Sequence, residues 1–334
     1  MLFYSSLTRI SPLRDVAWTL QKLPREEWAA GDYLLCEAEV RGYDHLELET
    51  GRMATLVSGD RFIGALGDRE ATLEATGSWR EVGEDLLLDL LTGAGLLGKM
   101  TSKSPFLPKL MHGHYHGHVM VAGEKATMRR FVPEVPKRAF TTPAVLLLGT
   151  SMSAGKTTAG QAIVRRLSAL GQRVVALKLA GAGRYRDVLH MQDAGAEWIF
   201  DFVDGGLPST VAPEADYRPV LEHVLSMAAA VEADVAVVEI GASPLAAYNG
   251  MVALDAVRDV VRFTVLAASD VYGVLGFQQL VGVKPDVVAG PTANTKAGID
   301  LVSRHAGIEI LNMSDQASNP ALDRLLRTAF DITE

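Results

Sequence analysis

The chain has 334 residues, of which 48% are hydrophobic and 22% are charged. This balance is ordinary for a globular protein, and the length leaves room for two domains with full cores. The formal net charge of −8 argues against a nucleic-acid or anionic-membrane surface, because both need basic patches.

The number of cysteines and the hydropathy of the chain exclude further classes of protein. The single cysteine, Cys36, cannot form an internal disulfide or a multi-cysteine zinc site. The opening residues MLFYSSLTRISPLRD show no apolar core followed by a small-residue cleavage site. No uncharged apolar run approaches the roughly twenty residues that a membrane helix needs. We therefore expect a cytoplasmic protein with no membrane and no nucleic-acid partner.

Residues 1–132 are predicted to form a smaller β-rich domain. Short apolar segments separated by glycine-containing turns are typical of a small antiparallel sheet or barrel. A helix is predicted around Glu84–Leu91, ending near Gly93 and Gly95. The predicted strands are Leu34–Val40, His45–Glu49, Met53–Val57 and Phe62–Leu66.

Four of the eight histidines, His112, His114, His116 and His118, alternate with other residues. In an extended strand, the period of two places all four imidazoles on one face. Such a face can bind a transition metal, although neighbours on a single strand rarely converge on one ion without a ligand from elsewhere. A polar strand that faces the substrate and a role at the domain interface stay open as alternatives.

Residues 133–143 are predicted to be a stiff connector. Pro133, Pro136 and Pro143 fall within eleven residues, and proline resists both a helix interior and a central strand. We therefore place the domain boundary here.

Residues 144–334 alternate between strand and helix patterns. Continuous Val/Ala/Ile/Leu strands between amphipathic helices predict an α/β fold with a doubly wound, mostly parallel sheet covered on both faces. Ligands of such sheets bind beyond the carboxyl ends of the strands. The predicted strands are Ala144–Leu148, Val174–Leu179, Trp198–Phe202, Val235–Ile240, Phe263–Ala267, Val287–Ala289 and Ile308–Leu311. The predicted helices are Lys156–Leu170, Arg184–Asp193, Tyr217–Val231, Val271–Val281, Lys296–His305 and Pro320–Ala329.

The first of these strands runs into a glycine-bearing loop, the sequence Gly-Lys-Thr and a helix. Backbone N–H groups of such a loop and of the first helical turn point at an anion, so the arrangement cradles a nucleotide's phosphates. Lys156 can reach the β- and γ-phosphates, and the Thr157 hydroxyl can ligate Mg²⁺. Five residues rather than four separate the two glycines. The predicted phosphate-binding residues are Gly149, Thr150, Ser151, Ser153, Ala154, Gly155, Lys156, Thr157 and Thr158.

Charged and polar residues follow three later strands. Lys178 ends a buried strand and can hold a substrate carboxylate, neutralise a transferring phosphoryl group, or simply extend to solvent from the strand end. Asp187, in the helix that follows, can ligate Mg²⁺ or interact favourably with the positive end of the helix dipole. Glu239 closes an apolar strand, which makes it a candidate metal ligand or water-orienting residue. Asn294 can pair with a purine edge or serve as a turn residue.

Three of these segments resemble the dethiobiotin synthetase and cobyrinate amide synthetase group of P-loop proteins. The long loop Gly149–Thr158, Lys178, and Glu239-Ile-Gly241 with Tyr248-Asn-Gly250 beyond it are similar to that group's motifs over roughly residues 144–312. The resemblance implies nucleotide and Mg²⁺ binding, while the first domain matches neither synthetase. The chain also resembles a set of two-domain P-loop proteins, in one branch of which an N-acetyltransferase activity on an amino acid is implied.

We therefore expect an ATP- and Mg²⁺-dependent synthetase that activates a small carboxylate or carbamate, with Lys156, Lys178 and Glu239 as catalytic residues. Mg²⁺ would be held by Thr157, Glu239 and Asp187, and members of this class often form homodimers. Two alternatives stay open: an N-acyltransferase whose loop grips the phosphates of coenzyme A, and a nucleotide-gated switch or metal-delivery GTPase. No Asn-Lys-x-Asp sequence that would read guanine is present.

Overall fold

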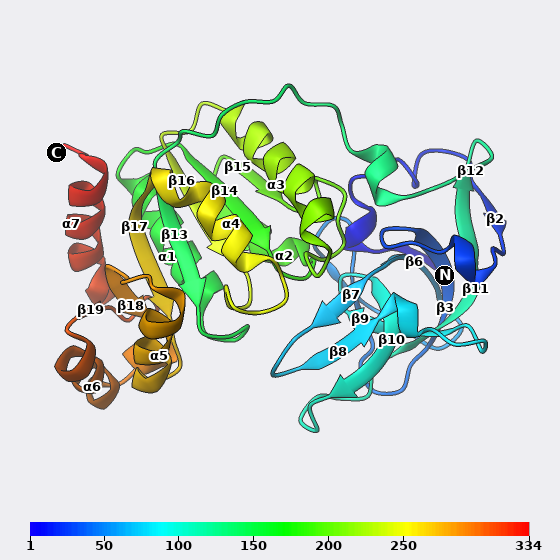
Figure 1. Ribbon diagram of the computed structural model, residues 1–334, viewed down its shortest axis with the longest axis horizontal. Coiled ribbons are helices and arrows are strands. Elements are labelled where there is room, and N and C mark those ends of the chain that lie inside the picture. Colours follow the sequence, from blue (N-terminus) through cyan, green and yellow to red (C-terminus); the bar gives the residue numbers. More distant parts are fainter. Residues whose placement is uncertain (334) are drawn as a thin grey trace. The chain divides into compact units, whose positions relative to one another are not determined.

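The fold comes from a computed structural model that describes residues 1–333 (Figure 1). This part of the chain forms two compact units. Unit 1 contains residues 1–134, 182–186 and 202–220, and unit 2 contains residues 135–181, 187–201 and 221–334. None of the helices in residues 1–333 combines the length and apolarity needed to cross a bilayer.

Unit 1 is built on a mixed sheet that closes on itself. Its strands follow the order β6–β3–β11–β9–β10, and β10 pairs back onto β6. The pairings are antiparallel except for β6 with β10. The ring strands are β3 (Tyr33–Glu39), β6 (Arg61–Leu66), β9 (Leu87–Thr92), β10 (Leu96–Lys103) and β11 (His112–Val121). The other strands are β1 (Leu2–Tyr4), β2 (Thr19–Gln21), β4 (His45–Glu47), β5 (Met53–Thr55), β7 (Asp68–Glu70), β8 (Ala75–Ser78) and β12 (Glu124–Lys125).

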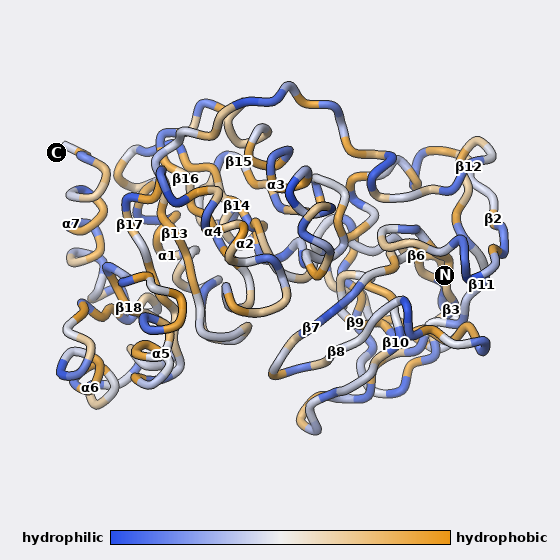
Figure 2. The backbone as a smooth tube through the Cα atoms, in the orientation of Figure 1, coloured by the Kyte–Doolittle hydropathy of each residue, from blue (hydrophilic) through white to orange (hydrophobic). Residues whose placement is uncertain are grey.

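The core of unit 1 lies inside this ring. Leu34, Phe62, Leu88 and Leu97 come from four different ring strands and are fully buried in one hydrophobic cluster. Burial of such side chains contributes roughly 1.5–3 kcal/mol each. Figure 2 shows hydrophobic and hydrophilic residues interspersed along the strands of this unit. The β-rich first domain predicted from the sequence is therefore organised by one apolar interior.

Unit 2 is built on a parallel sheet of seven strands in the order β15–β14–β16–β13–β17–β18–β19. The strands are β13 (Ala144–Gly149), β14 (Val174–Ala180), β15 (Trp198–Asp201), β16 (Val235–Ile240), β17 (Val261–Ala267), β18 (Val287–Ala289) and β19 (Glu309–Ile310). The helices are α1 (Lys156–Ala169), α2 (Tyr185–Asp193), α3 (Glu214–Ala229), α4 (Gly250–Val257), α5 (Val271–Val281), α6 (Lys296–Ala306) and α7 (Asn319–Phe330).

Helices cover both faces of this sheet. A methyl group placed on Gly160 of α1 would lie 3.0 Å from Leu147 of β13 and 3.3 Å from Met191 of α2, so α1 and α2 share one face. Gly250 of α4 approaches Ile240, whose side chain points to the opposite face from that of its neighbour Glu239. The predicted α/β fold with a doubly wound parallel sheet is confirmed.

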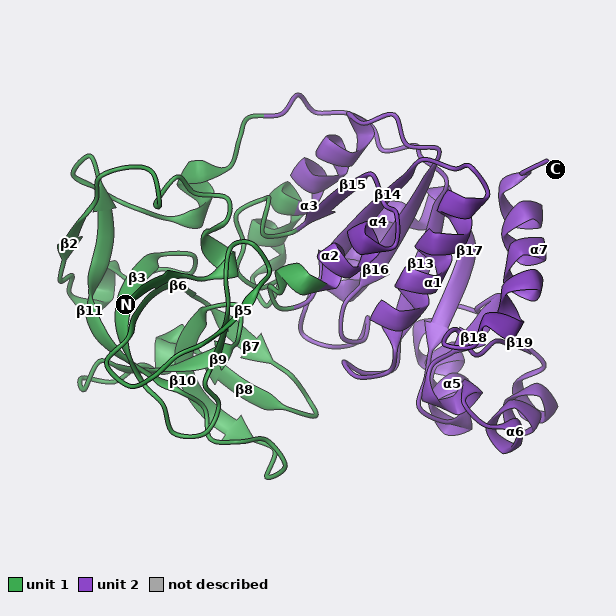
Figure 3. Cartoon of the chain, turned by 180° about the vertical axis from the view of Figure 1, so that it is seen from behind, with its two compact units in different colours: residues 1–134, 182–186, 202–220 green, residues 135–181, 187–201, 221–334 purple. Residues whose placement is uncertain are grey.

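Two short segments of the second half of the chain belong to unit 1, as the colouring of Figure 3 shows. Residues 182–186 follow β14, and residues 202–220 follow β15 and extend into α3. The change from unit 1 to unit 2 after Glu134 falls inside the proline-rich stretch at residues 133–143.

The helix predicted around Glu84–Leu91 is wrong, because these residues lead into strand β9. Leu86 has a φ of 52°, a left-handed conformation that no α-helix contains. Asp89 is buried and accepts a hydrogen bond from the backbone N–H of Met100 at 2.8 Å, across the hairpin that β9 forms with β10. Cross-strand pairing therefore outweighs the apolar run that favoured a helix.

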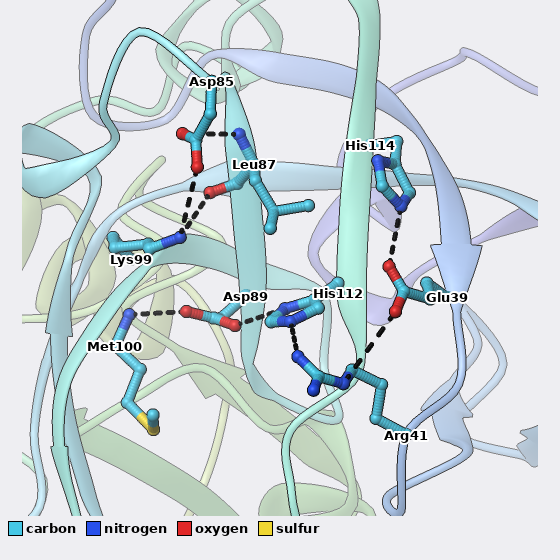
Figure 4. A network of polar contacts seen from close by, with 9 residues as sticks. All are labelled: Glu39, Arg41, Asp85, Leu87, Asp89, Lys99, Met100, His112 and His114. Carbon is cyan, nitrogen blue, oxygen red and sulfur yellow. Dashed lines mark hydrogen bonds and ion pairs between the residues drawn. The ribbon is translucent and has the colours of Figure 1, made fainter.

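The prediction that all four histidines of the β11 tract share one face is also wrong. The pairing register shifts between Tyr115 and Gly117, and this irregularity turns His118 into the interior, where it is fully buried. His112 and His114 instead pair with carboxylates of neighbouring strands, His112 with Asp89 at 2.7 Å and His114 with Glu39 at 2.9 Å (Figure 4). Within residues 1–333 no group of three or more His, Cys, Asp or Glu side chains is arranged to hold a metal ion.

Candidate functional site

The charged residues predicted at strand ends of unit 2 lie in one row across the sheet. Glu239 is paired in register with Leu147 on one side and with Lys178 on the other, and Lys178 is paired with Asp201 of β15. Residues in register on neighbouring strands point to the same face. Because Leu147 packs against Gly160 of α1, this row lies on the α1 face.

The loop between β13 and α1, which is predicted to bind phosphates, lies between two glycines. Gly149 ends the strand, and the N–H of Thr150 donates to the carbonyl of Ala267 at 3.1 Å. Gly155 precedes the helix with a φ of 99°, which residues with a side chain rarely adopt. Around them Ala154 is buried and Ser153 exposed, while Ser151 and Thr157 are half-buried and Thr158 is exposed.

Lys156 begins α1 and folds back over this loop. Its ammonium donates to the carbonyl oxygens of Ser151 at 2.7 Å and Ala242 at 3.0 Å, and the residue is only 4% exposed. Burial lowers the pKa of this ammonium, and the nearby Glu239 carboxylate partly offsets the effect. Ala242 itself has a φ of 54°, a strained conformation that tends to persist at functional sites.

Lys178 is the second buried cation of the site. Its ammonium lies 2.5 Å from Asp187 Oδ2, so the structure brings these two predicted residues together. Burial disfavours the charged form of Lys178, but the combined charges of Asp187, Glu239 and Asp201 outweigh it and raise the pKa. Lys178 is therefore held as a protonated amine between carboxylates.

Glu239 carries a buried oxygen without a partner. The residue is 3% exposed, and its Oε2 has no hydrogen-bond donor within residues 1–333. Burial and the charge of Asp187 raise the pKa of this carboxyl, while Lys156 and Lys178 act in the opposite direction. Buried polar atoms are nearly always hydrogen-bonded or bound to an ion, so this oxygen is available to a ligand or a water.

A magnesium ion fits the oxygens present here. Mg²⁺ is usually bound by one or two carboxylates together with phosphates and waters, and Thr157 and Glu239 supply a hydroxyl and a carboxylate. Asp187, the third predicted ligand, is engaged by Lys178 through Oδ2. Only its other oxygen, Oδ1, could ligate an ion while that pair persists.

The loop after β18 adjoins the loop between β13 and α1. A methyl group placed on Gly290 would lie 2.2 Å from the carbonyl oxygen of Ala154, and one placed on Gly155 would lie 3.1 Å from Gly290 Cα. Asn294 follows this loop at the end of a short 3₁₀ turn, Pro291–Ala293, and is exposed. Its side chain is thus carried on a segment that contacts the loop between β13 and α1.

Asp201 is a site residue that the sequence reasoning missed. It is fully buried, ends β15 and lies beside Lys178 in the sheet. The predicted strand ran one residue further, to Phe202, which hid the charge at its end. The signal was the same as for Glu239, a carboxylate that closes an apolar strand.

Replacing Asp187 with asparagine should move the pH dependence of any activity that needs protonated Lys178. The ion pair contributes to the raised pKa of Lys178, so its loss lowers that pKa. The alkaline limb of the rate profile should therefore shift to lower pH, by on the order of one unit. A profile measured beside Asp193→Asn, a change in the same helix, checks this expectation; identical limbs in both variants would contradict it.

A search against protein families finds no match, and neither does a search against curated proteins. Solved structures with a similar chain path include chloroplast FtsY from Physcomitrella patens, at 16% identity and a TM-score of 0.39, covering 57% of this chain and 67% of that one. A DUF1611 family protein from Anabaena variabilis matches at 15% identity and a TM-score of 0.38, covering 59% of this chain and 63% of that one. HypB from Helicobacter pylori in complex with nickel matches at 12% identity and a TM-score of 0.38, covering 58% and 90%. Likeness at this level says nothing of what the present chain binds.

Proposed function

We propose that the chain is an ATP- and Mg²⁺-dependent synthetase that activates a small carboxylate or carbamate by phosphoryl transfer. One observation carries this proposal. Two buried lysines, Lys156 and Lys178, lie near the buried carboxylate of Glu239, whose Oε2 has no hydrogen-bond partner among the described residues, and all three adjoin the loop that we propose binds phosphates. Two cations and one metal-binding carboxylate match the charge of a triphosphate that is losing its γ-phosphoryl group.

Each residue has a role in this scheme. The backbone N–H groups from Gly149 to Thr158 hold the phosphates, and Lys156 exchanges its two carbonyl acceptors for phosphate oxygens. Thr157 and Glu239 would hold Mg²⁺, which neutralises charge on the β- and γ-phosphates when it is bound. Lys178 stays protonated through Asp187 and faces the charge that develops on the transferring group.

The reaction balances without a further cofactor. A carboxylate oxygen of the substrate attacks the γ-phosphorus, the bond to the bridging oxygen of ADP breaks, and ADP leaves. The acyl phosphate is then attacked by an amine at its carbonyl carbon, and inorganic phosphate is released. The protein contributes mostly positioning and electrostatic stabilisation to these steps.

Trapping the acyl phosphate tests the proposal. The purified chain is incubated with Mg·ATP, hydroxylamine and a panel of small carboxylates, and hydroxamate and ADP are measured together. We expect both products in equal amounts with at least one carboxylate, and ADP near background without any. Binding of coenzyme A with no ADP formed would instead favour the acyltransferase. A preference for GTP with slow hydrolysis independent of carboxylate would favour the switch protein.

A further inference from the structure

The segment of residues 182–186 follows β14, includes the first two residues of α2 and belongs to unit 1. Ala182 forms a β-bridge with Ser209, and the N–H of Gly183 donates to the carbonyl of Pro208 at 2.9 Å. These contacts fix the backbone at the start of the segment.

A buried carboxylate fixes its other end. Glu47 of β4 is fully buried and accepts hydrogen bonds from the backbone N–H groups of Tyr185 at 2.9 Å and Arg186 at 3.0 Å. It also accepts one from the hydroxyl of Ser6 at 2.5 Å. Charge-assisted bonds of this kind are roughly twice as strong as neutral ones. The backbone around Arg184 and Arg186 is therefore set before any ligand arrives.

The side chains on this fixed backbone are left without anionic partners. Within residues 1–333 neither the guanidinium of Arg184 nor that of Arg186 has a hydrogen bond or a carboxylate within ion-pair distance, although Glu47 is close by. Arg9, in contrast, pairs with Asp204 at 2.9 Å and stacks over the Tyr185 ring. Arg184 is exposed and Arg186 half-buried, so both guanidinium groups reach solvent.

Tyr43 adds a hydrogen-bond donor to these two cations. A methyl group placed on Gly93 would lie 2.5 Å from the hydroxyl oxygen of Tyr43, and the carbonyl of Gly93 accepts from the N–H of Glu47 at 2.6 Å. The phenol therefore lies beside the residue whose carboxylate holds the segment, and the charges of Arg184 and Arg186 both act to lower its pKa. Burial nevertheless raises the pKa of this phenol, so it stays protonated at neutral pH. Its hydroxyl has no hydrogen-bond partner in the described part of the chain and is half-buried.

We propose that Arg184, Arg186 and Tyr43 form a binding site for a carboxylate group of the substrate. This proposal rests on the proposed function and names the residues that would bind its carboxylate substrate. Guanidinium groups offer planar pairs of donors that match a carboxylate. Phosphate sites commonly draw on backbone N–H groups at a helix start, and here Glu47 already occupies those donors. Arg186 is joined directly to Asp187, so the site and the Lys178 ion pair are consecutive in the chain.

Calorimetric titration of the full chain tests this site apart from the nucleotide site. The protein is first titrated with Mg²⁺ and a non-hydrolysable ATP analogue, and the saturated protein is then titrated with succinate, citrate or pyrophosphate. We expect a dicarboxylate or tricarboxylate to bind the natural chain, and Arg184→Gln with Arg186→Gln to weaken that binding at least ~10-fold. Arg184→Lys with Arg186→Lys should restore only part of it, because lysine lacks the planar fork.

The charge-matched control is Arg52→Gln with Arg262→Gln, two exposed arginines elsewhere in the chain. It should bind the carboxylates as the natural protein does. The proposal is overturned if the Arg184/Arg186 variant binds them equally well, if the control loses as much, or if only pyrophosphate binds. It is also overturned if the nucleotide analogue binds but no carboxylate does up to millimolar concentration. In that last case nucleotide binding would stand, whereas failure of the analogue itself would remove the proposed function.

Discussion

Replacing Lys156 with methionine should abolish nucleotide binding while leaving the fold intact. Methionine keeps the apolar stem and removes the buried ammonium, whose pKa is already lowered by burial. We expect the affinity for Mg·ATP to fall ~100-fold or more, because charge-assisted contacts to phosphate are lost. Bound nucleotide at 100 times its Kd should stabilise the natural protein by about 2.7 kcal/mol, and the variant should show no such rise in Tm.

The control for this change is Lys137→Met, which removes an exposed lysine of the same unit, paired with Glu222 at 2.7 Å. It should keep both the affinity and the nucleotide-dependent rise in Tm. A Lys156 variant that still binds Mg·ATP as the natural protein does would remove the basis of the enzymatic scheme.

Replacing Glu239 with glutamine should separate activity from stability. Turnover should fall by about 100-fold or more, because the carboxylate that would bind Mg²⁺ is lost. The unliganded protein should nevertheless become more stable at neutral pH. Burial raises the pKa of Glu239, so the folded state binds its proton more tightly than the unfolded state does. Ionisation of this group therefore lowers the free energy of unfolding as pH rises from the ordinary pKa of a glutamate through the raised one.

Urea denaturation over a series of pH values measures this effect. The stability advantage of Glu239→Gln should be absent at acidic pH and should grow as pH rises through that window. Glu232→Gln removes an exposed carboxylate of the same unit and should show no such trend. A Glu239 variant that is less stable at neutral pH, or one with full turnover, would contradict the role given to this residue.

The parallel sheet could be predicted from the sequence because its strands are buried on both faces. Such strands appear as continuous apolar runs, and β16 and β18 have the predicted bounds. The same regularity shows where each strand ends, so charged residues at strand ends such as Lys178 and Glu239 can be predicted as site residues. Asp201 is not predicted, because the predicted end of β15 lies one residue beyond it.

Unit 1 was less predictable because its structure depends on pairing between distant segments. The apolar run Leu86–Leu91 fits both a helix and a strand, and only its partners β10 and β11 decide between them. The displacement of His118 depends on a register shift against β3, which no local pattern records. The support that Glu47 gives to residues 182–186 joins positions more than 130 apart in the sequence, so it too was invisible.

Residues 182–186 and 202–220 belong to unit 1, so the two halves of the chain depend on each other. If the gene were divided at the proline-rich stretch, the upstream product would keep Glu47 as a fully buried charge but lose its two backbone donors. The downstream product would contain residues 182–186 and 202–220 without the unit 1 residues that they contact. Neither half is therefore expected to fold fully when it is expressed without the other.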